Sequence, residues 1–165
     1  MGLSYQMIDA IGREHAYRPI TGDVLFIGRQ AVPMTPAGLA TKLREHCRIV
    51  DETKIEIDRF TSDRNKHYAE QASDRSIFRA LGVNRVKAVD VSPYEGAEVI
   101  HDLNQPLPDS LRGTADFIVD SSVLDNVFDP AMGLRNLTEM LRPGGRLLMS
   151  NAWNTRDVCG RRPKN

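Results

Sequence analysis

The sequence predicts an α/β protein with a doubly wound, mostly parallel sheet, and two observations carry this prediction. Short apolar runs alternate with segments of helical periodicity, which is typical of β-α-β units. In addition, residues 115–151 read as strand, turn, helix, glycine turn and strand. A unit of this kind is parallel and right-handed in nearly all known cases. We therefore expect ligands at the carboxyl ends of the strands, where open parallel sheets bind them.

The composition indicates one packed domain without a strong charge. The chain has 165 residues, of which 41% are hydrophobic, and its 22 basic and 22 acidic residues give a net charge of zero. This balance gives no electrostatic reason to expect nucleic acid or a membrane surface as a partner. No apolar run approaches the roughly 20 residues of a membrane span. Cys47 and Cys159 have no metal-ligand spacing, so we expect no metal and a cytoplasmic location with reduced thiols.

The first third of the chain predicts helix, strand and helix. Residues 4–17 have the pattern of an amphipathic helix, and residues 23–28 read as a buried strand that ends in glycine. Thr35-Pro36 indicates the start of a second helix that reaches about His46. A strand, glycine, loop and helix in this order can cradle an anion or a cofactor, because the first N–H groups of the helix are unpaired.

The middle of the chain is harder to interpret. Residues 54–58 alternate like an exposed strand, whereas most of residues 48–72 are polar, so we expect an insertion or a mobile loop there. A short helix is predicted from Ser73-Asp74 to Gly82.

Four strands are predicted after this helix. The first two are residues 86–92 and 98–102, and their connection is too short for a crossover helix. The third is the apolar run 117–119. A helix then begins at Asp129-Pro130, and Pro143-Gly144-Gly145 ends it before a last strand. We assign residues 1–151 to the domain and residues 152–165 to a polar tail.

Acids stand at the ends of three predicted strands, and a glycine ends the first strand. These residues are Asp90, Asp102, Asp120 and Gly28. Strand ends share one edge of a doubly wound sheet, where an acid after a strand can accept from both hydroxyls of a ribose. The pattern suggests a nucleoside-containing cofactor, although aspartate also caps turns. Asp51 is the alternative ribose acid, because it follows the glycine at about the usual spacing.

Side chains with a clear catalytic pattern are not found in the sequence. It contains no nucleophile elbow, P-loop or zinc-protease motif. His101 falls within a predicted strand and is interpreted as a packed or partly exposed side chain. The catalytic residues are therefore left unassigned.

In this order, the stretches VKAVDVS, IHDLNQPLP and ADFIVDSSVLDNVFDPAMGLRNLTEMLRPGGRLLMSN resemble class I S-adenosylmethionine-dependent methyltransferases of the small-molecule type. The resemblance covers roughly residues 20–151 and is strongest from Ala115 onward. It implies a Rossmann-like methyltransferase fold with S-adenosyl-L-methionine as the cofactor.

By position, the resemblance also implies roles for single residues. Gly28 matches the first glycine of the family's glycine-rich loop. Asp90, followed by Val91, matches the acid that holds the ribose hydroxyls. Asp102 and Leu103 match the pair beside the adenine. Asp120 and Ser121 match the turn near the methionine part and the substrate.

The chain departs from the family pattern in its glycine-rich loop and at its end. The family loop usually has three glycines behind an acidic residue, whereas this chain has Phe26 at the acidic position and keeps only Gly28. Arg29 and Gln30 are predicted to hydrogen-bond the cofactor carboxylate instead. The family normally adds two more strands, which we expect to be lacking here. The last strand would then be an exposed edge, which leaves three alternatives: the chain is a truncated piece of a longer enzyme, it forms a homodimer through this edge, or it is not an active enzyme.

The resemblance implies a methyltransferase that acts on a small molecule or a sugar. The retained acids favour this reading. The alternative is a non-catalytic methyltransferase-like domain that serves binding or assembly, and the reduced glycine loop favours that alternative.

Overall fold

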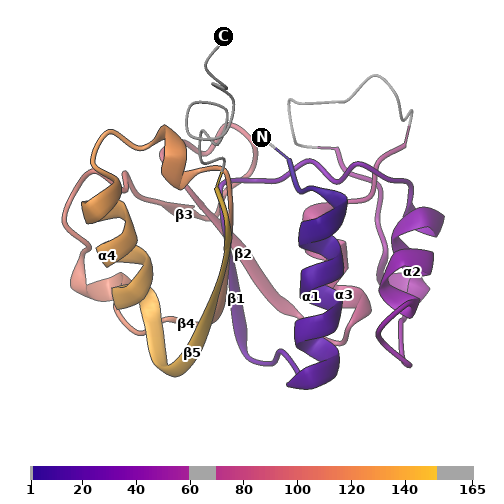
Figure 1. Ribbon diagram of the computed structural model, residues 1–165. Helices are drawn as coiled ribbons and strands as arrows, with labels where there is room; N and C mark the ends of the chain where they lie inside the picture. Colours follow the sequence, from indigo (N-terminus) through magenta and orange to yellow (C-terminus); the bar gives the residue numbers. More distant parts are fainter. Residues whose placement is uncertain (1, 60–69, 152–165) are drawn as a thin grey trace, which may run out of the picture.

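The computed structural model describes residues 2–59 and 70–151, which form a five-stranded parallel sheet with helices on both faces (Figure 1). The strands are β1 (Asp23–Ile27), β2 (Arg85–Asp90), β3 (Val99–Ile100), β4 (Ala115–Ser121) and β5 (Leu141–Ser150). The helices are α1 (Tyr5–Tyr17), α2 (Pro36–Arg44), α3 (Asp74–Ala80) and α4 (Pro130–Met140). The doubly wound parallel sheet that the sequence predicts is confirmed.

The first strand lies at the centre of the sheet. The strand order is β3-β2-β1-β4-β5, so β1 pairs with β2 on one side and with β4 on the other. Val24 to Ile27 are all buried, which explains the uninterrupted apolar run. The chain winds outward from β1 to β3 and then returns to β4. The reversal between β1 and β4 is the point at which such sheets form a ligand crevice.

Successive side chains of β1 build two separate cores. Phe26 belongs to the core beneath α1, α2 and α3, where its ring centroid lies 5.4 Å from that of Phe78. Ile27, the next residue, belongs to the core beneath α4 together with Leu137. Figure 1 shows α4 alone on one face and the other three helices on the opposite face. The alternation of a strand therefore places α1, α2 and α3 on one side of the sheet and α4 on the other.

Local capping signals start three of the helices where the sequence predicts them. The side chains of Ser4, Thr35 and Asp129 each accept a hydrogen bond from the backbone N–H three residues later. Pro36 and Pro130 stand in the first turns, where a missing N–H does not matter. Within the described ranges, none of the helices is both long and apolar enough to cross a bilayer.

The strand expected at residues 54–58 is wrong. Glu52–Lys54 form a short 3-10 helix (η1), and Ile57 makes only an isolated bridge with Ala72. The backbone N–H of Asp58 donates to the carbonyl of Gln71 at 2.7 Å, so this hydrogen bond satisfies a backbone group of the segment without a sheet. The remainder of the expected insertion, residues 60–69, lies outside the described residues, as does the expected tail at 152–165.

The last strand begins earlier than predicted. Leu141 pairs with Ala115, and pairing resumes only at Arg146, which faces Phe117, so residues 142–145 form a bulge. Gly144 has a φ of 80°, which fits the turn predicted for Pro143-Gly144-Gly145. β5 forms one edge of the described sheet. The pairing of this edge with a second copy stays a prediction.

The connection between β2 and β3 contains no helix, as the sequence predicts. Residues 91–98 consist of bends and turns. This short connection suffices because β3 pairs only with the last two residues of β2, Val89 and Asp90. The chain does not have to return along the sheet, and the whole loop stays at the carboxyl edge.

Candidate functional site

A pocket of about 330 Å³ lies at the carboxyl ends of β1, β2 and β3. Five predicted site residues line it, namely Gly28, Asp90, Val91, Asp102 and Leu103. The loop after β4 contributes the remaining wall. The pocket therefore occupies the reversal of strand order beside β1, where ligands of such sheets bind.

Gly28 makes the floor of the pocket close to the end of β2. Its N–H donates to the carbonyl of Val89 at 2.7 Å, and its φ of 66° lies in the left-handed region. A Cβ at this position would lie 3.3 Å from Cγ2 of Val123 and 3.8 Å from Oδ2 of Asp90. Glycine thus lets the chain leave β1 without narrowing the pocket in front of Asp90.

Asp90 presents a half-buried carboxylate at the end of β2. Among the described residues, its side chain accepts a hydrogen bond from the N–H of Ser92 at a long 3.3 Å. A carboxylate has about four acceptor positions. Asp90 therefore keeps acceptor capacity for hydroxyl donors of a ligand.

Asp102 is held in place by its neighbour Asn104. Oδ1 of Asp102 accepts from the backbone N–H of Asn104 at 2.9 Å and from its side-chain amide at 2.8 Å. These bonds, the backbone one first, lower the pKa of Asp102 below its ordinary value. The side-chain oxygen of Asn104 accepts from the N–H of Asp129 at the start of α4. Asp102 is therefore an ionised acceptor whose turn is fixed to a helix.

Asp120 and Ser121 lie outside the lining of this pocket. Asp120 is completely buried and accepts from the N–H of Val123 at 3.1 Å and from the amide of Asn151 at 2.9 Å. Burial raises the pKa of Asp120. The hydroxyl of Ser121 donates to the carbonyl of Gly2 at 3.3 Å. Asp120 thus closes the turn after β4.

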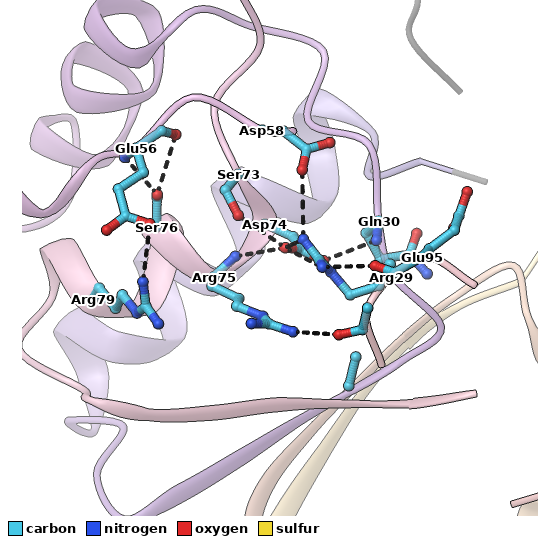
Figure 2. Close-up of polar contacts among 12 residues, drawn as sticks. Arg29, Gln30, Glu56, Asp58, Ser73, Asp74, Arg75, Ser76, Arg79 and Glu95 are labelled. Carbon is cyan, nitrogen blue, oxygen red and sulfur yellow. Dashed lines mark hydrogen bonds and ion pairs between the residues drawn. The ribbon is translucent and has the colours of Figure 1, made fainter. Parts of the chain in front are cut away.

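Arg29 and Gln30 also lie outside the pocket lining, in a buried network (Figure 2). Nε and Nη2 of Arg29 donate to the two oxygens of Asp74, each at 2.9 Å. The N–H of Gln30 donates to Asp74 at 2.9 Å, and its side-chain amide donates to the carbonyl of Ile27 at 2.9 Å. The structure thus bonds both residues to the protein itself, and their contact with a cofactor carboxylate stays a prediction.

Asp51, the alternative ribose acid, is distant from the pocket in the fold. Its carboxylate caps η1 through Thr53, and its own N–H donates to the carbonyl of Ala80 at the end of α3. The structure therefore brings Asp90, and not Asp51, to the pocket.

Several lining residues escaped sequence reasoning. Asn104, Val123, Asn126 and Val127 contribute to the wall, and so does His101, for which the sequence predicts a packed or partly exposed side chain and no role in a site. All five stand in loops or just beyond a strand end. Loop residues follow no hydrophobic period, so only the position of His101 beside an acid could have signalled its place.

Outside the pocket, Asp9, Glu45 and His46 place their ligand atoms within 4.8 Å of one another. The ammonium of Lys42 lies 2.7 Å from Asp9 and 2.5 Å from Glu45. Arg13, whose Nε lies 2.8 Å from the other oxygen of Asp9, and Lys42 therefore already supply two positive charges to the two carboxylates. The group reads as an ion-pair cluster between α1 and α2.

No family model matches the chain, and neither does any curated protein. Among solved structures, it is similar to a proposed S-adenosyl-L-methionine-dependent methyltransferase from Methanococcus maripaludis, with 16% identity and a TM-score of 0.45. That similarity covers 93% of this chain and 59% of the other. It is also similar to the trans-methyltransferase CalH, solved in complex with SAH, with 17% identity and a TM-score of 0.41 over 88% of this chain and 35% of CalH. This chain thus spans less than two thirds of either protein.

Proposed function

We propose that this chain binds S-adenosyl-L-methionine and transfers its methyl group to a small molecule or a sugar. The observation that carries the proposal is the pocket itself. It gathers Gly28, Asp90, Val91, Asp102 and Leu103 around one hollow at the reversal of the strand order. These are the positions to which the sequence resemblance assigns the ribose and the adenine.

The chemistry of these residues fits a nucleoside. The carboxylate of Asp90 can accept from two neighbouring ribose hydroxyls, which is a charge-assisted and therefore strong arrangement. The ionised carboxylate of Asp102 can accept from the amino group of adenine. Gly28 leaves room for close approach, and Leu103 is buried beside the pocket, where it offers an apolar surface to the base.

The transfer step needs alignment more than it needs a catalytic side chain. The methyl group leaves the sulfonium sulfur as the acceptor atom forms a bond to it, so the nucleophile, carbon and sulfur must lie in line. A general base is needed only for an acceptor of low acidity. We propose that Asp120 and Ser121 do not contact the cofactor directly. They hold in place the turn after β4, which faces the reacting part of the cofactor.

The second candidate is a methyltransferase-like domain that binds a ligand without transfer. The placement of Arg29 favours it, because its guanidinium faces Asp74 in the interior and not the pocket. A cofactor carboxylate would then have no arginine partner from the loop after β1. A nucleoside could bind in the pocket while the methionine part stays unheld.

Calorimetric titration of the 165-residue chain with S-adenosylhomocysteine tests the proposal. We expect micromolar binding by the wild type. In Asp90→Ala the dissociation constant should rise about 30-fold or more, because a charged hydrogen-bonding group contributes about 2 kcal/mol or more. Asp51→Ala is the matched control and should bind like the wild type.

Adenosine separates the two candidates. Equal affinity for adenosine and S-adenosylhomocysteine would favour the second, since the methionine part would then contribute nothing. No binding of either by the folded chain would refute both assignments of the pocket. Methyl transfer itself is tested by incubating the chain with methyl-labelled cofactor and a panel of small acceptors.

A further inference from the structure

Two arginines connect the start of α3 to the loop after β2, whose first residue, Val91, lines the pocket (Figure 2). Nη1 of Arg29 donates to the carbonyl of Glu95 at 3.0 Å. Nη2 of Arg75, in the first turn of α3, donates to the carbonyl of Gly96 at 2.8 Å. Both carbonyls belong to residues 91–98, the loop that joins β2 to β3.

The guanidinium of Arg29 is held in one orientation. Its side chain is 1% exposed and that of Asp74 is 0% exposed. Two of its nitrogens are bonded to Asp74, and Asp58 lies 3.5 Å from Nη2. Because the guanidinium is planar and rigid, fixing two nitrogens fixes the direction of the third. Nη1 is thereby aimed at Glu95.

Arg75 fixes the far end of the same loop. Besides Gly96, its Nη2 contacts a carboxylate oxygen of Glu98 at 2.8 Å. The other carboxylate oxygen of Glu98 accepts from the N–H of Ala88 in β2 at 3.0 Å. The end of the loop is thus fastened both to α3 and to β2.

Side-chain packing holds only the end of this loop. Ala97 is buried in the core beneath α1, α2 and α3, whereas Val91 is 67% exposed and Tyr94 is 83% exposed. Exposed side chains bury little apolar surface, so they contribute little to ordering a loop. The arginine bonds to Glu95 and Gly96 therefore carry much of the constraint on this segment.

We propose that Arg29 and Arg75 are positioning residues, which hold the loop 91–98 from behind and so fix the pocket wall at Asp90 and Val91. Neither arginine lines the pocket. The loop after β1 keeps a single glycine, and the residue beside that glycine anchors a neighbouring loop. The consequence for ligand affinity rests on the proposed function, whereas the ordering of the loop does not.

Hydrogen exchange of the 165-residue chain, measured without added ligand, tests the ordering directly. In Arg75→Gln we expect amides of residues 91–98, followed from milliseconds onward, to exchange about fivefold faster or more, because a local constraint is lost. Arg79→Gln is the matched control. Arg79 stands on the same helix and pairs with Glu56 at 3.1 Å, so its loss should leave the loop unchanged.

Titration with S-adenosylhomocysteine supplies the second readout. Arg75→Gln should raise the dissociation constant about tenfold, which corresponds to one hydrogen bond that orders the wall. Arg79→Gln should not raise it, although both variants lose one ion pair of α3. Arg29→Lys, which keeps the charge beside Asp74 but loses the fork, should act in the same direction as Arg75→Gln.

Three results would overturn the proposal. Unchanged exchange of residues 91–98 in Arg75→Gln is the first. Exchange that rises equally in all elements is the second, since it would show general destabilisation. The third is unchanged affinity in a variant whose loop does exchange faster. If the wild type fails to bind, the proposed function falls, and the exchange result alone decides the ordering of the loop.

Discussion

Strands ending in aspartate meet two different environments in this protein. Asp90 and Asp102 line the pocket on the β2–β3 side of β1. Asp120, at the end of β4, is completely buried. Bonds from Asn104 lower the pKa of Asp102, whereas burial raises the pKa of Asp120. An apolar run that ends in aspartate thus predicts an acid at the sheet edge, but not whether it faces a ligand or closes a turn.

The neighbouring strands explain the difference. β5 runs alongside β4 to its end, and Asn151, the next residue, reaches over Asp120 and donates to it. β3 likewise pairs with the end of β2, but the residues that follow it, His101 and Asp102, line the pocket beside Asp90. The residues that follow the adjacent strand therefore decide which acid is available.

The largest expected effect on stability comes from the buried acid. Asp120→Ala removes the acceptor of Val123 N–H and of the Asn151 amide, and two orphaned donors should lower the free energy of unfolding by about 2–3 kcal/mol. Urea unfolding measures this loss. Asp120→Asn keeps one acceptor and should lose less. An Asp120→Ala chain that stays equally stable but loses S-adenosylhomocysteine would move Asp120 into the binding site.

A smaller loss of stability is expected from substituting Gly28, where the backbone leaves β1 beside the pocket. Gly28→Ala forces a side chain into the left-handed region, which costs about 1–2 kcal/mol of stability. Its methyl group should also weaken S-adenosylhomocysteine binding. Gly82→Ala has the same kind of conformation, with φ of 85° and no atom within 4 Å of the added Cβ. Equal affinity in both variants would show that Gly28 does not face the ligand.

Removing the side-chain hydrogen bond from Asn104 to Asp102 should reduce the binding free energy by about the value of one hydrogen bond. Asn104→Ala removes the side-chain donor to Asp102 and the acceptor of Asp129 N–H. We expect S-adenosylhomocysteine to bind about fivefold more weakly, as measured by calorimetry. Asn84→Ala, on an exposed turn before β2, should bind normally. A normal affinity of Asn104→Ala would mean that the backbone bond alone orients Asp102.

The smallest expected effect is a change of stability with pH, which distinguishes Asp120 from Asp102. The raised pKa of Asp120 means that the folded chain takes up its proton more readily than the unfolded chain, so this group adds stability as the pH falls toward 3.8. Asp102, with a lowered pKa, stabilises above 3.8 and loses that contribution only at lower pH. Between pH 7 and pH 4, the wild type should therefore gain stability relative to Asp120→Asn in urea unfolding. A constant difference would contradict the raised pKa.

The order of the elements could be predicted because their signals are local. Ser4, Thr35 and Asp129 cap helices within three residues of themselves. The apolar runs of β1 and β4 are continuous because both faces of these strands are covered. By contrast, the alternation at residues 54–58 predicted a strand that does not form. Alternating polar and apolar residues indicate an extended segment, but they do not show whether a neighbouring strand is available to pair with it.

The candidate site was predictable only in part. Asp90 and Asp102 follow from their place after strands, but the partner of Arg29 does not. Asp74 stands 45 residues away in the sequence, and no local pattern connects the two. The side chain of Arg29 looked free to meet a ligand because a sequence shows charge and spacing, whereas pairing in the interior depends on the packing of α3 against the loop after β1.

The central place of the first strand has a consequence for how the protein is made. β1 needs β4 on one edge, and β4 begins about 90 residues after β1 ends, which is on the order of ten seconds of synthesis at a ribosome. During that interval the apolar segment from Val24 to Ile27 stays exposed, and the backbone groups on one of its edges have no partner strand. Nascent chains of this protein should therefore engage chaperones early, and a pulse-chase with chaperone capture should find them there before residue 115 has emerged.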